Sequence, residues 1–262
     1  MAKRLKIKNI WHIREIIKND FENKFISRVV NRLADIIVVN SRTTGEALKV
    51  SKEKIRLVYD AVEDKKDEVI VKTPHDNFVV GMAGRINRWK GQKVFVDAAA
   101  IVHEHYPDVM FEIAGSVYKG EEYLKEDLQA YIVEKGLENI VLLLGHIDNM
   151  DNFYKNLDLF ILPSIQLEPF GLVVIEAMEF CIPVIATNHG GPVEIIDNKK
   201  DGYLVEPFNS EELASTIEKL MLSPKEREKI GIKGRNKKRK MFSIKTMIKS
   251  TESVLDEVIK KL

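Results

Sequence analysis

The chain of 262 residues has a single cysteine, Cys181, and no apolar run long enough to cross a bilayer. One cysteine excludes an intrachain disulfide framework and fits a reducing compartment. The basic start, residues 1–8, has no apolar core of signal-peptide length. We therefore expect a cytoplasmic protein. The formal net charge of +1 gives no general support to nucleic-acid binding, so no nucleic-acid partner is expected.

Positive charge is unevenly distributed along the chain. Residues 1–66 are basic, and a second basic run lies at Lys237-Lys238-Arg239-Lys240. Such segments can contact an anionic surface, which would place the protein at the inner face of the membrane. A solvated basic face and a solvated helix end explain the same residues.

Apolar segments alternate with helical segments over most of the chain, which predicts an α/β fold. Strands separated by helices of this length form a parallel sheet that is covered by helices on both faces. The expected strands are 36–39, 55–59, 78–83, 109–114, 140–144, 158–162, 184–187 and 203–205. The expected helices are 41–48, 92–105, 121–135, 172–180, 192–197, 210–222, 224–241 and 244–261. In such sheets the ligand binds at the carboxyl ends of the strands.

The most informative stretch is Glu168-Pro169-Phe170-Gly171-Leu172, followed by Glu176 and then by Pro183-Val184-Ile185-Ala186. Glu168 lies on a loop after an apolar strand, and Glu176 lies eight positions, or about two helical turns, further on, on a helix that begins near Gly171. Two such acceptors can bind two sets of hydroxyl groups, while the helix N-terminus between them favours negative charge. Spacing alone would also fit two glutamates on a solvated helix face.

The full string resembles the donor-binding signature of retaining glycosyltransferases of family 4, which have the GT-B fold and belong to the glycosyl transferases group 1. The resemblance implies that Glu168 contacts the hydroxyls of the transferred sugar and that Glu176 holds the ribose hydroxyls. Backbone N–H groups around Phe170, Gly171 and Leu172 would bind phosphate or sugar. A helix salt bridge is the alternative for Glu176.

A second element, Gly84-Arg85 followed by Lys90-Gly91, joins a strand to the next helix. It is similar to the family element that binds the donor diphosphate, which assigns that role to Arg85 and Lys90. Arginine offers a planar fork and lysine a point charge, and together they can clamp a diphosphate. The alternative is a solvated turn with two surface cations.

Further candidates follow from the resemblance at other strand ends. His146 and Ile147 match the loop that contacts the nucleobase through backbone groups. Glu194 is expected to cap or orient the loop that precedes it, which contains Gly190 and Gly191. His12 resembles a first-domain histidine that points into the cleft near the sugar. Small residues that would let the donor approach are Gly115, Ser116, Gly190 and Gly191. The proposed catalytic set is thus Glu168, Arg85, Lys90 and His12.

The resemblance implies a complete Rossmann-like donor-binding domain at 65–241 and only the last part of an N-terminal, acceptor-binding Rossmann-like domain at 1–64. Residues 242–262 would form a helix that packs back toward the N-terminal part. One departure is Asp60-Ala61-Val62-Glu63, where the family has Asn-Gly-Val-Asp. An incomplete first domain would also leave apolar surface for a homodimer or a partner chain.

The expected function is retaining transfer of a sugar from a UDP- or GDP-sugar to a hydroxyl of a glycan or lipid-linked acceptor, in cell-envelope polysaccharide or glycolipid synthesis. No two aspartates are separated by one residue. We therefore expect no metal site, no cofactor and a metal-independent reaction. Two alternatives remain open. One is a nucleotide-sugar-binding fragment or half of a split enzyme, and the other is an epimerase with the same fold.

Overall fold

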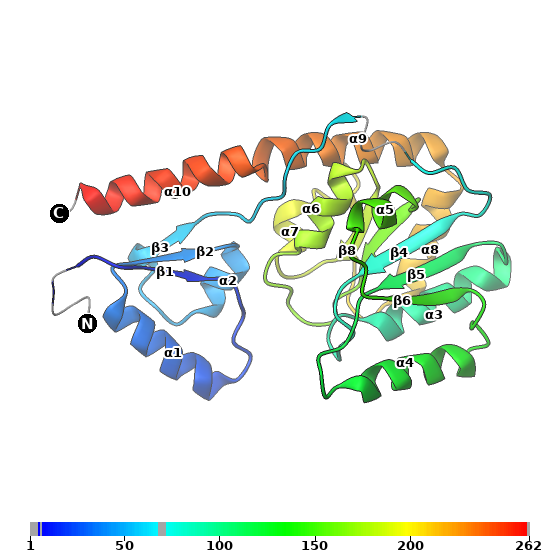
Figure 1. The fold of residues 1–262 in the computed structure, drawn as a ribbon, viewed down its shortest axis with the longest axis horizontal. Coiled ribbons are helices and arrows are strands. Elements are labelled where there is room, and N and C mark those ends of the chain that lie inside the picture. Colours follow the sequence, from blue (N-terminus) through cyan, green and yellow to red (C-terminus); the bar gives the residue numbers. More distant parts are fainter. Residues whose placement is uncertain (1–4, 6, 68–71, 261–262) are drawn as a thin grey trace.

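The computed structural model describes residues 5, 7–67 and 72–260 and contains two parallel β-sheets (Figure 1). Residues 7–60 form a small unit and residues 72–241 a large unit. A long helix, α10 (Ile244–Ile259), returns from the large unit and lies along the small one. The domain boundaries 1–64, 65–241 and 242–262 stay a prediction.

The small unit is a three-stranded sheet between two helices. Its strands β1 (Ile10–Ile13), β2 (Ile36–Val39) and β3 (Ile55–Leu57) are parallel and lie in that order. Helix α1 (Asp20–Leu33) covers one face, and α10 places Val254 against the opposite face. A short helix, α2 (Arg42–Ala47), begins after Ser41, whose hydroxyl accepts a hydrogen bond from the Thr44 amide as an N-cap does.

The large unit contains a six-stranded parallel sheet in the order β6-β5-β4-β7-β8-β9. Its strands are β4 (Val79–Ala83), β5 (Met110–Ala114), β6 (Val141–Gly145), β7 (Leu159–Leu162), β8 (Val184–Thr187) and β9 (Tyr203–Val205). Its helices are α3 (Gln92–His105), α4 (Glu122–Glu134), α5 (Met150–Lys155), α6 (Leu172–Glu179), α7 (Pro192–Ile195), α8 (Ser210–Met221) and α9 (Pro224–Met241).

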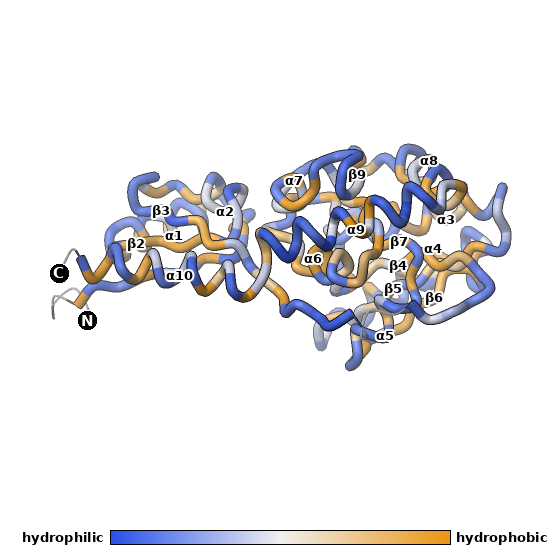
Figure 2. Tube along the Cα trace, turned by 90° about the horizontal axis from the view of Figure 1, so that it is seen from above, coloured by the Kyte–Doolittle hydropathy of each residue, from blue (hydrophilic) through white to orange (hydrophobic). Residues whose placement is uncertain are grey.

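Both faces of the large sheet are buried, as the sequence predicts for a parallel sheet. Helices α3, α4 and α8 pack on one face through residues such as Phe95, Ile132 and Ile217. Helices α5 and α6 pack on the other through Phe153 and Ile175. Figure 2 shows the apolar strands inside and polar segments on the outer helices. Within the described residues, no helix is long and apolar enough to cross a membrane.

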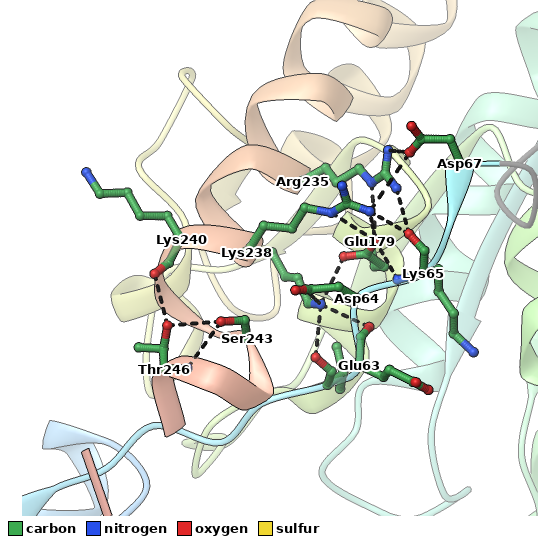
Figure 3. A network of polar contacts seen from close by, with 12 residues as sticks. Glu63, Asp64, Lys65, Asp67, Glu179, Arg235, Lys238, Lys240, Ser243 and Thr246 are labelled. Carbon is green, nitrogen blue, oxygen red and sulfur yellow. Dashed lines mark hydrogen bonds and ion pairs between the residues drawn. The ribbon is translucent and has the colours of Figure 1, made fainter. Parts of the chain in front are cut away.

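The chain passes between the units twice, and the two passages touch. The amide of Val62, in the linker, donates to the carbonyl of Phe242 at 3.3 Å, beside the α9–α10 junction. Next to this contact, Lys238 of α9 is 0% exposed. Its Nζ donates to the carbonyls of Val62 and Glu63 and to the carboxylate of Asp64 at 2.8–3.1 Å, and it forms an ion pair with Glu179 Oε2 at 2.9 Å (Figure 3).

This network corrects the expectation that the run 237–240 is a solvated helix end or a lipid contact. Lys238 holds the linker, and Lys237 pairs with Asp197 and Asp201. Burial disfavours the charge of Glu179, but hydrogen bonds from Arg239 and Lys238 hold its pKa below the usual value. A buried carboxylate with this many cationic partners is stable as an ion.

Most predicted elements are confirmed within one or two residues, and three differences matter. Strand β1 covers Ile10–Ile13, so His12 lies inside the strand and not after it. Helices α1 and α5 were not predicted. The predicted last helix ends at Ile259, and residue 261 of that prediction lies outside the described residues.

Candidate functional site

The site lies where the strand order of the large sheet reverses. Strand β4 pairs with β5 on one side and with β7 on the other, so their loops leave in opposite directions. Crevices at such switch points are the usual ligand sites of open parallel sheets. A cavity of about 530 Å³ opens here between the two units. Its lining residues are Arg14, Glu15, Asn40, Asp60, Gly84, Arg85, Asn87, Trp89, Lys90 and Glu168–Val173.

An ion pair joins the two loops across the switch point. Lys90 Nζ lies 2.7 Å from Glu168 Oε2, and the two side chains are only 14% and 9% exposed. Ser164, just after β7, donates its hydroxyl to the same carboxylate oxygen at 3.0 Å. Asn87 accepts the amide of Lys90 at 2.9 Å and fixes the turn from which that lysine extends. The structure therefore brings together the two residues that the sequence assigned to the diphosphate and to the sugar.

Arg85 lies on the rim of the same cavity. Its guanidinium stacks over the ring of Tyr118 at 3.5 Å, and its backbone carbonyl accepts from Gln92 at 2.9 Å. Stacking orients the planar fork while leaving its N–H groups available to an anion. On the wall that the large unit forms, the cavity thus presents the cations Arg85 and Lys90 next to the carboxylate of Glu168.

Two glycines set the position of the Glu168 loop. The amide of Gly191 donates to the carbonyl of Glu168 at 2.7 Å. A Cβ on Gly191 would come within 2.3 Å of the Phe170 backbone, and one on Gly190 within 2.6 Å of Glu168. Only glycine permits this approach. The predicted glycine pair therefore supports the loop from behind and does not line the cavity.

The small unit supplies the opposite wall. Arg14 Nη2 lies 2.7 Å from Asp60 Oδ1, and Asn40 donates to the other oxygen of Asp60 at 2.9 Å. Lys18 reaches across to the large unit, where its Nζ lies 4.4 Å from the ring of Trp89. Partial burial lowers the pKa of Lys18, and the charge of Glu168 opposes that shift.

Other predicted residues lie outside this cavity. Glu176 accepts a hydrogen bond at 2.7 Å from Tyr154, whose pKa is raised well above its usual value by burial and then by this carboxylate.

His146 and Ile147 follow β6, the edge strand of the large sheet that pairs with β5. Gly115 and Ser116 follow β5, and the Ser116 carbonyl accepts from the amide of Ile86 at 3.0 Å. His12 is exposed on β1 and does not line the cavity.

Several residues of the cavity were not predicted from the sequence. Trp89 and Asn87 lie between Arg85 and Lys90, inside a turn that the sequence had already marked. Ser164 lies two residues after β7, at a strand end where a ligand site was expected. Asn40 and Arg14 carry no local signal, because they meet Asp60 only through the fold of the small unit.

The family model of the glycosyl transferases group 1 matches residues 63–237. The chain belongs to that family. The matched segment contains both loops of the switch point, and so it includes Arg85, Lys90 and Glu168.

Two curated relatives illustrate the match. The chain is 30% identical over 217 residues to the capsular polysaccharide biosynthesis glycosyltransferase CapM of Staphylococcus aureus, covering 83% of this chain and 55% of CapM. It is 34% identical over 160 residues to the D-inositol 3-phosphate glycosyltransferase of Paenarthrobacter aurescens, covering 60% of this chain and 38% of that protein. The group 1 chain described here thus spans about half or less of these two relatives.

Solved structures show the same fold. HepE of Anabaena in complex with UDP and glucose superposes with a TM-score of 0.90 at 24% identity, covering 97% of this chain and 73% of HepE. The sucrose-phosphate synthase of Thermosynechococcus elongatus gives 0.84 at 21% identity, covering 100% of this chain and 71% of the synthase. The expected GT-B type α/β fold is confirmed.

Proposed function

We propose that the protein is a retaining glycosyltransferase that transfers a sugar from a UDP- or GDP-sugar to an acceptor hydroxyl. The observation that carries this proposal is the pairing of Lys90 with Glu168 at the switch point, with Arg85 on the same rim. This arrangement suits a ligand that has an anionic diphosphate next to a hydroxyl-rich sugar. HepE, which shares the fold, was solved with UDP-glucose as well as with UDP.

In the proposed reaction, Arg85 and Lys90 bind the diphosphate and stabilise the negative charge that develops on the leaving nucleoside diphosphate. Glu168 accepts hydrogen bonds from the sugar hydroxyls and orients the ring. The bond between the anomeric carbon and the diphosphate oxygen breaks, and the acceptor oxygen bonds to that carbon on the same face, which retains the configuration. The proton of the acceptor hydroxyl passes to the departing diphosphate. Glu176 would hold the ribose while Tyr154 keeps its carboxylate in place. We propose no metal or cofactor.

CapM and other relatives support a role in cell-envelope polysaccharide or lipopolysaccharide synthesis, with a glycan or lipid-linked acceptor. We propose a cytoplasmic protein that contacts the inner face of the membrane. The basic surface that fits this contact is a hollow rimmed by five lysines at α9 and at the turn before β9, in place of the 237–240 run. These lysines are Lys199, Lys200, Lys225, Lys229 and Lys233.

The alternative is a nucleotide-sugar-binding half that needs a second copy or a partner chain for catalysis. One observation favours it. On α1, Phe21 and Phe25 are 80% and 59% exposed and lie one helical turn apart. Neighbouring exposed aromatic side chains of this size are typical of a contact surface. Transfer activity of the purified chain, at a concentration where analytical ultracentrifugation shows a monomer, would exclude this alternative.

The first test is calorimetric titration of the purified chain with UDP, GDP and ADP. Selective binding of one nucleotide is expected and would identify the base. Transfer is then assayed with the matching nucleotide sugars by release of nucleoside diphosphate in the presence of acceptor sugars. Formation of an epimerised nucleotide sugar in its place would support the epimerase.

Replacing Arg85 by alanine is expected to lower the affinity for the nucleoside diphosphate by at least about tenfold. The affinity for the free nucleoside should stay almost unchanged. A charge-assisted hydrogen bond to phosphate contributes about 1.5–3 kcal/mol, whereas a nucleoside makes no such contact. Titration of both ligands into both proteins measures the difference. Equal losses for the two ligands would contradict the diphosphate role. Arg88→Ala, in the same turn, is the matched control.

A further inference from the structure

A carboxylate of the large unit caps a helix of the small unit. Glu194 lies on α7, directly after the glycine pair that supports the Glu168 loop. Its two oxygens accept the backbone amides of Arg42 at 2.9 Å and Thr43 at 3.0 Å, the first two amides of α2. Tyr59 of the small unit donates its hydroxyl to the same carboxylate at 3.1 Å. The expected local capping role of Glu194 is thus replaced by a contact between units.

The charge and the geometry of this contact fit a carboxylate specifically. The first amides of a helix have no partner within the helix, and a negative charge there is favourable. Ser41 satisfies only the third amide, that of Thr44. Both remaining amides depend on Glu194. A glutamine has the same shape, but it would point its amide group at one of these N–H donors.

Two sets of contacts connect Glu194 and its partners to the loop that carries Glu168. Behind Glu194, the amide of Gly191 holds the Glu168 carbonyl. In front of it, Thr44 of α2 donates to the carbonyl of Pro169 at 3.4 Å, and Tyr59 packs its ring against Phe170 with centroids 5.9 Å apart. The small unit is therefore linked to the loop that carries Glu168 both through the carboxylate of Glu194 and by direct contacts.

We propose that Glu194 is a positioning residue. It docks the small unit onto the loop that carries Glu168 and so sets the distance between the two walls of the cavity. The proposal rests on the proposed transfer reaction for its consequence, but the docking itself is independent of it. Glu194 does not line the cavity, so it acts through α2, Tyr59 and the Glu168 loop.

The test compares Glu194→Gln with Glu211→Gln, a matched change at an exposed glutamate of α8. In Glu194→Gln, hydrogen exchange of the Arg42 and Thr43 amides should become about tenfold faster, as expected for loss of a charged hydrogen bond. The turnover number should fall by at least about tenfold, while nucleoside diphosphate affinity stays within about threefold. Glu194 accepts four hydrogen bonds, since the Thr43 hydroxyl also donates to it at 3.3 Å. Tyr59→Phe removes one of the four and should give a smaller effect on both. Glu211→Gln should behave as the wild type.

Unchanged exchange in Glu194→Gln would overturn the docking, whether or not the protein is a transferase. Faster exchange with unchanged turnover would overturn the positioning role. A parallel loss of nucleotide binding would make Glu194 part of the donor site and would also overturn it. If the wild type neither binds nor transfers, the proposed function fails, and the exchange measurement alone decides the docking.

Discussion

Replacing Glu168 by alanine is expected to lower the rate of transfer by about 100- to 1,000-fold, the effect typical of removing one contact that stabilises a transition state. Nucleoside diphosphate affinity should stay nearly unchanged, because the carboxylate is assigned to the sugar and because Lys90 is released to the diphosphate. Transfer assays and calorimetry on the same preparation measure the two effects.

Two further variants sharpen this result. Glu168→Gln keeps the size of the side chain and an acceptor for Ser164 but loses the charge that pairs with Lys90. It should retain more activity than alanine if the contact with the sugar is mainly a hydrogen bond. Glu211→Ala, far from the cavity on α8, should leave both measurements unchanged. A large parallel loss of nucleotide affinity in Glu168→Ala would contradict its assignment as a sugar contact.

Replacing Lys238 by methionine is expected to destabilise the fold by about 3 kcal/mol, as reported generally for removal of one partner from a buried ion pair. The substitution keeps the apolar stem but leaves Glu179 and the carbonyls of Val62 and Glu63 without the cation that joins them. Arg235 and Arg239 still pair with Glu179, which limits the loss. The measurement is denaturant unfolding followed by fluorescence and circular dichroism.

The matched control is Lys240→Met, two residues further along the same helix. Its ammonium group is exposed, so stability should change by no more than about 0.5 kcal/mol. An unfolding midpoint of Lys238→Met equal to that of Lys240→Met would show that the linker network contributes little. The network holds the linker just after Asp60, which lines the cavity. A loss of nucleotide binding in Lys238→Met alone would therefore be compatible with a stabilising role of Lys238.

The sequence predicted the strands and helices of the large unit because their signals are local, and the structure places Arg85, Lys90 and Glu168 in one cavity, while their roles stay a prediction. Gly84-Arg85 and Lys90 flank one turn, and Glu168 lies in one contiguous motif, so each residue could be placed at a strand end. The order of the strands then brings the two loops together. The partners that complete the site, such as Asn40 with Asp60, are 20 residues apart and meet only in the folded chain.

Helix α1 was missed because its polar pattern is inverted. It buries Asn23 and Ser27 while exposing Phe21 and Phe25. Asn23 donates to the carbonyl of Ala47 at 2.8 Å, and Ser27 accepts the amide of Lys49 at 3.0 Å. Side chains that serve as hydrogen-bond partners of a distant loop interrupt the apolar periodicity from which helices are recognised.

The return of α10 to the small unit fixes the order in which the molecule can be completed during synthesis. The face of the small sheet formed by Ile36, Val38 and Val58 is covered by Val254, a residue of α10, which follows the large unit in the chain. Domains fold as units while the ribosome is still adding residues. The large unit can therefore close its core before the small one, because the small sheet is covered only once α10 has emerged.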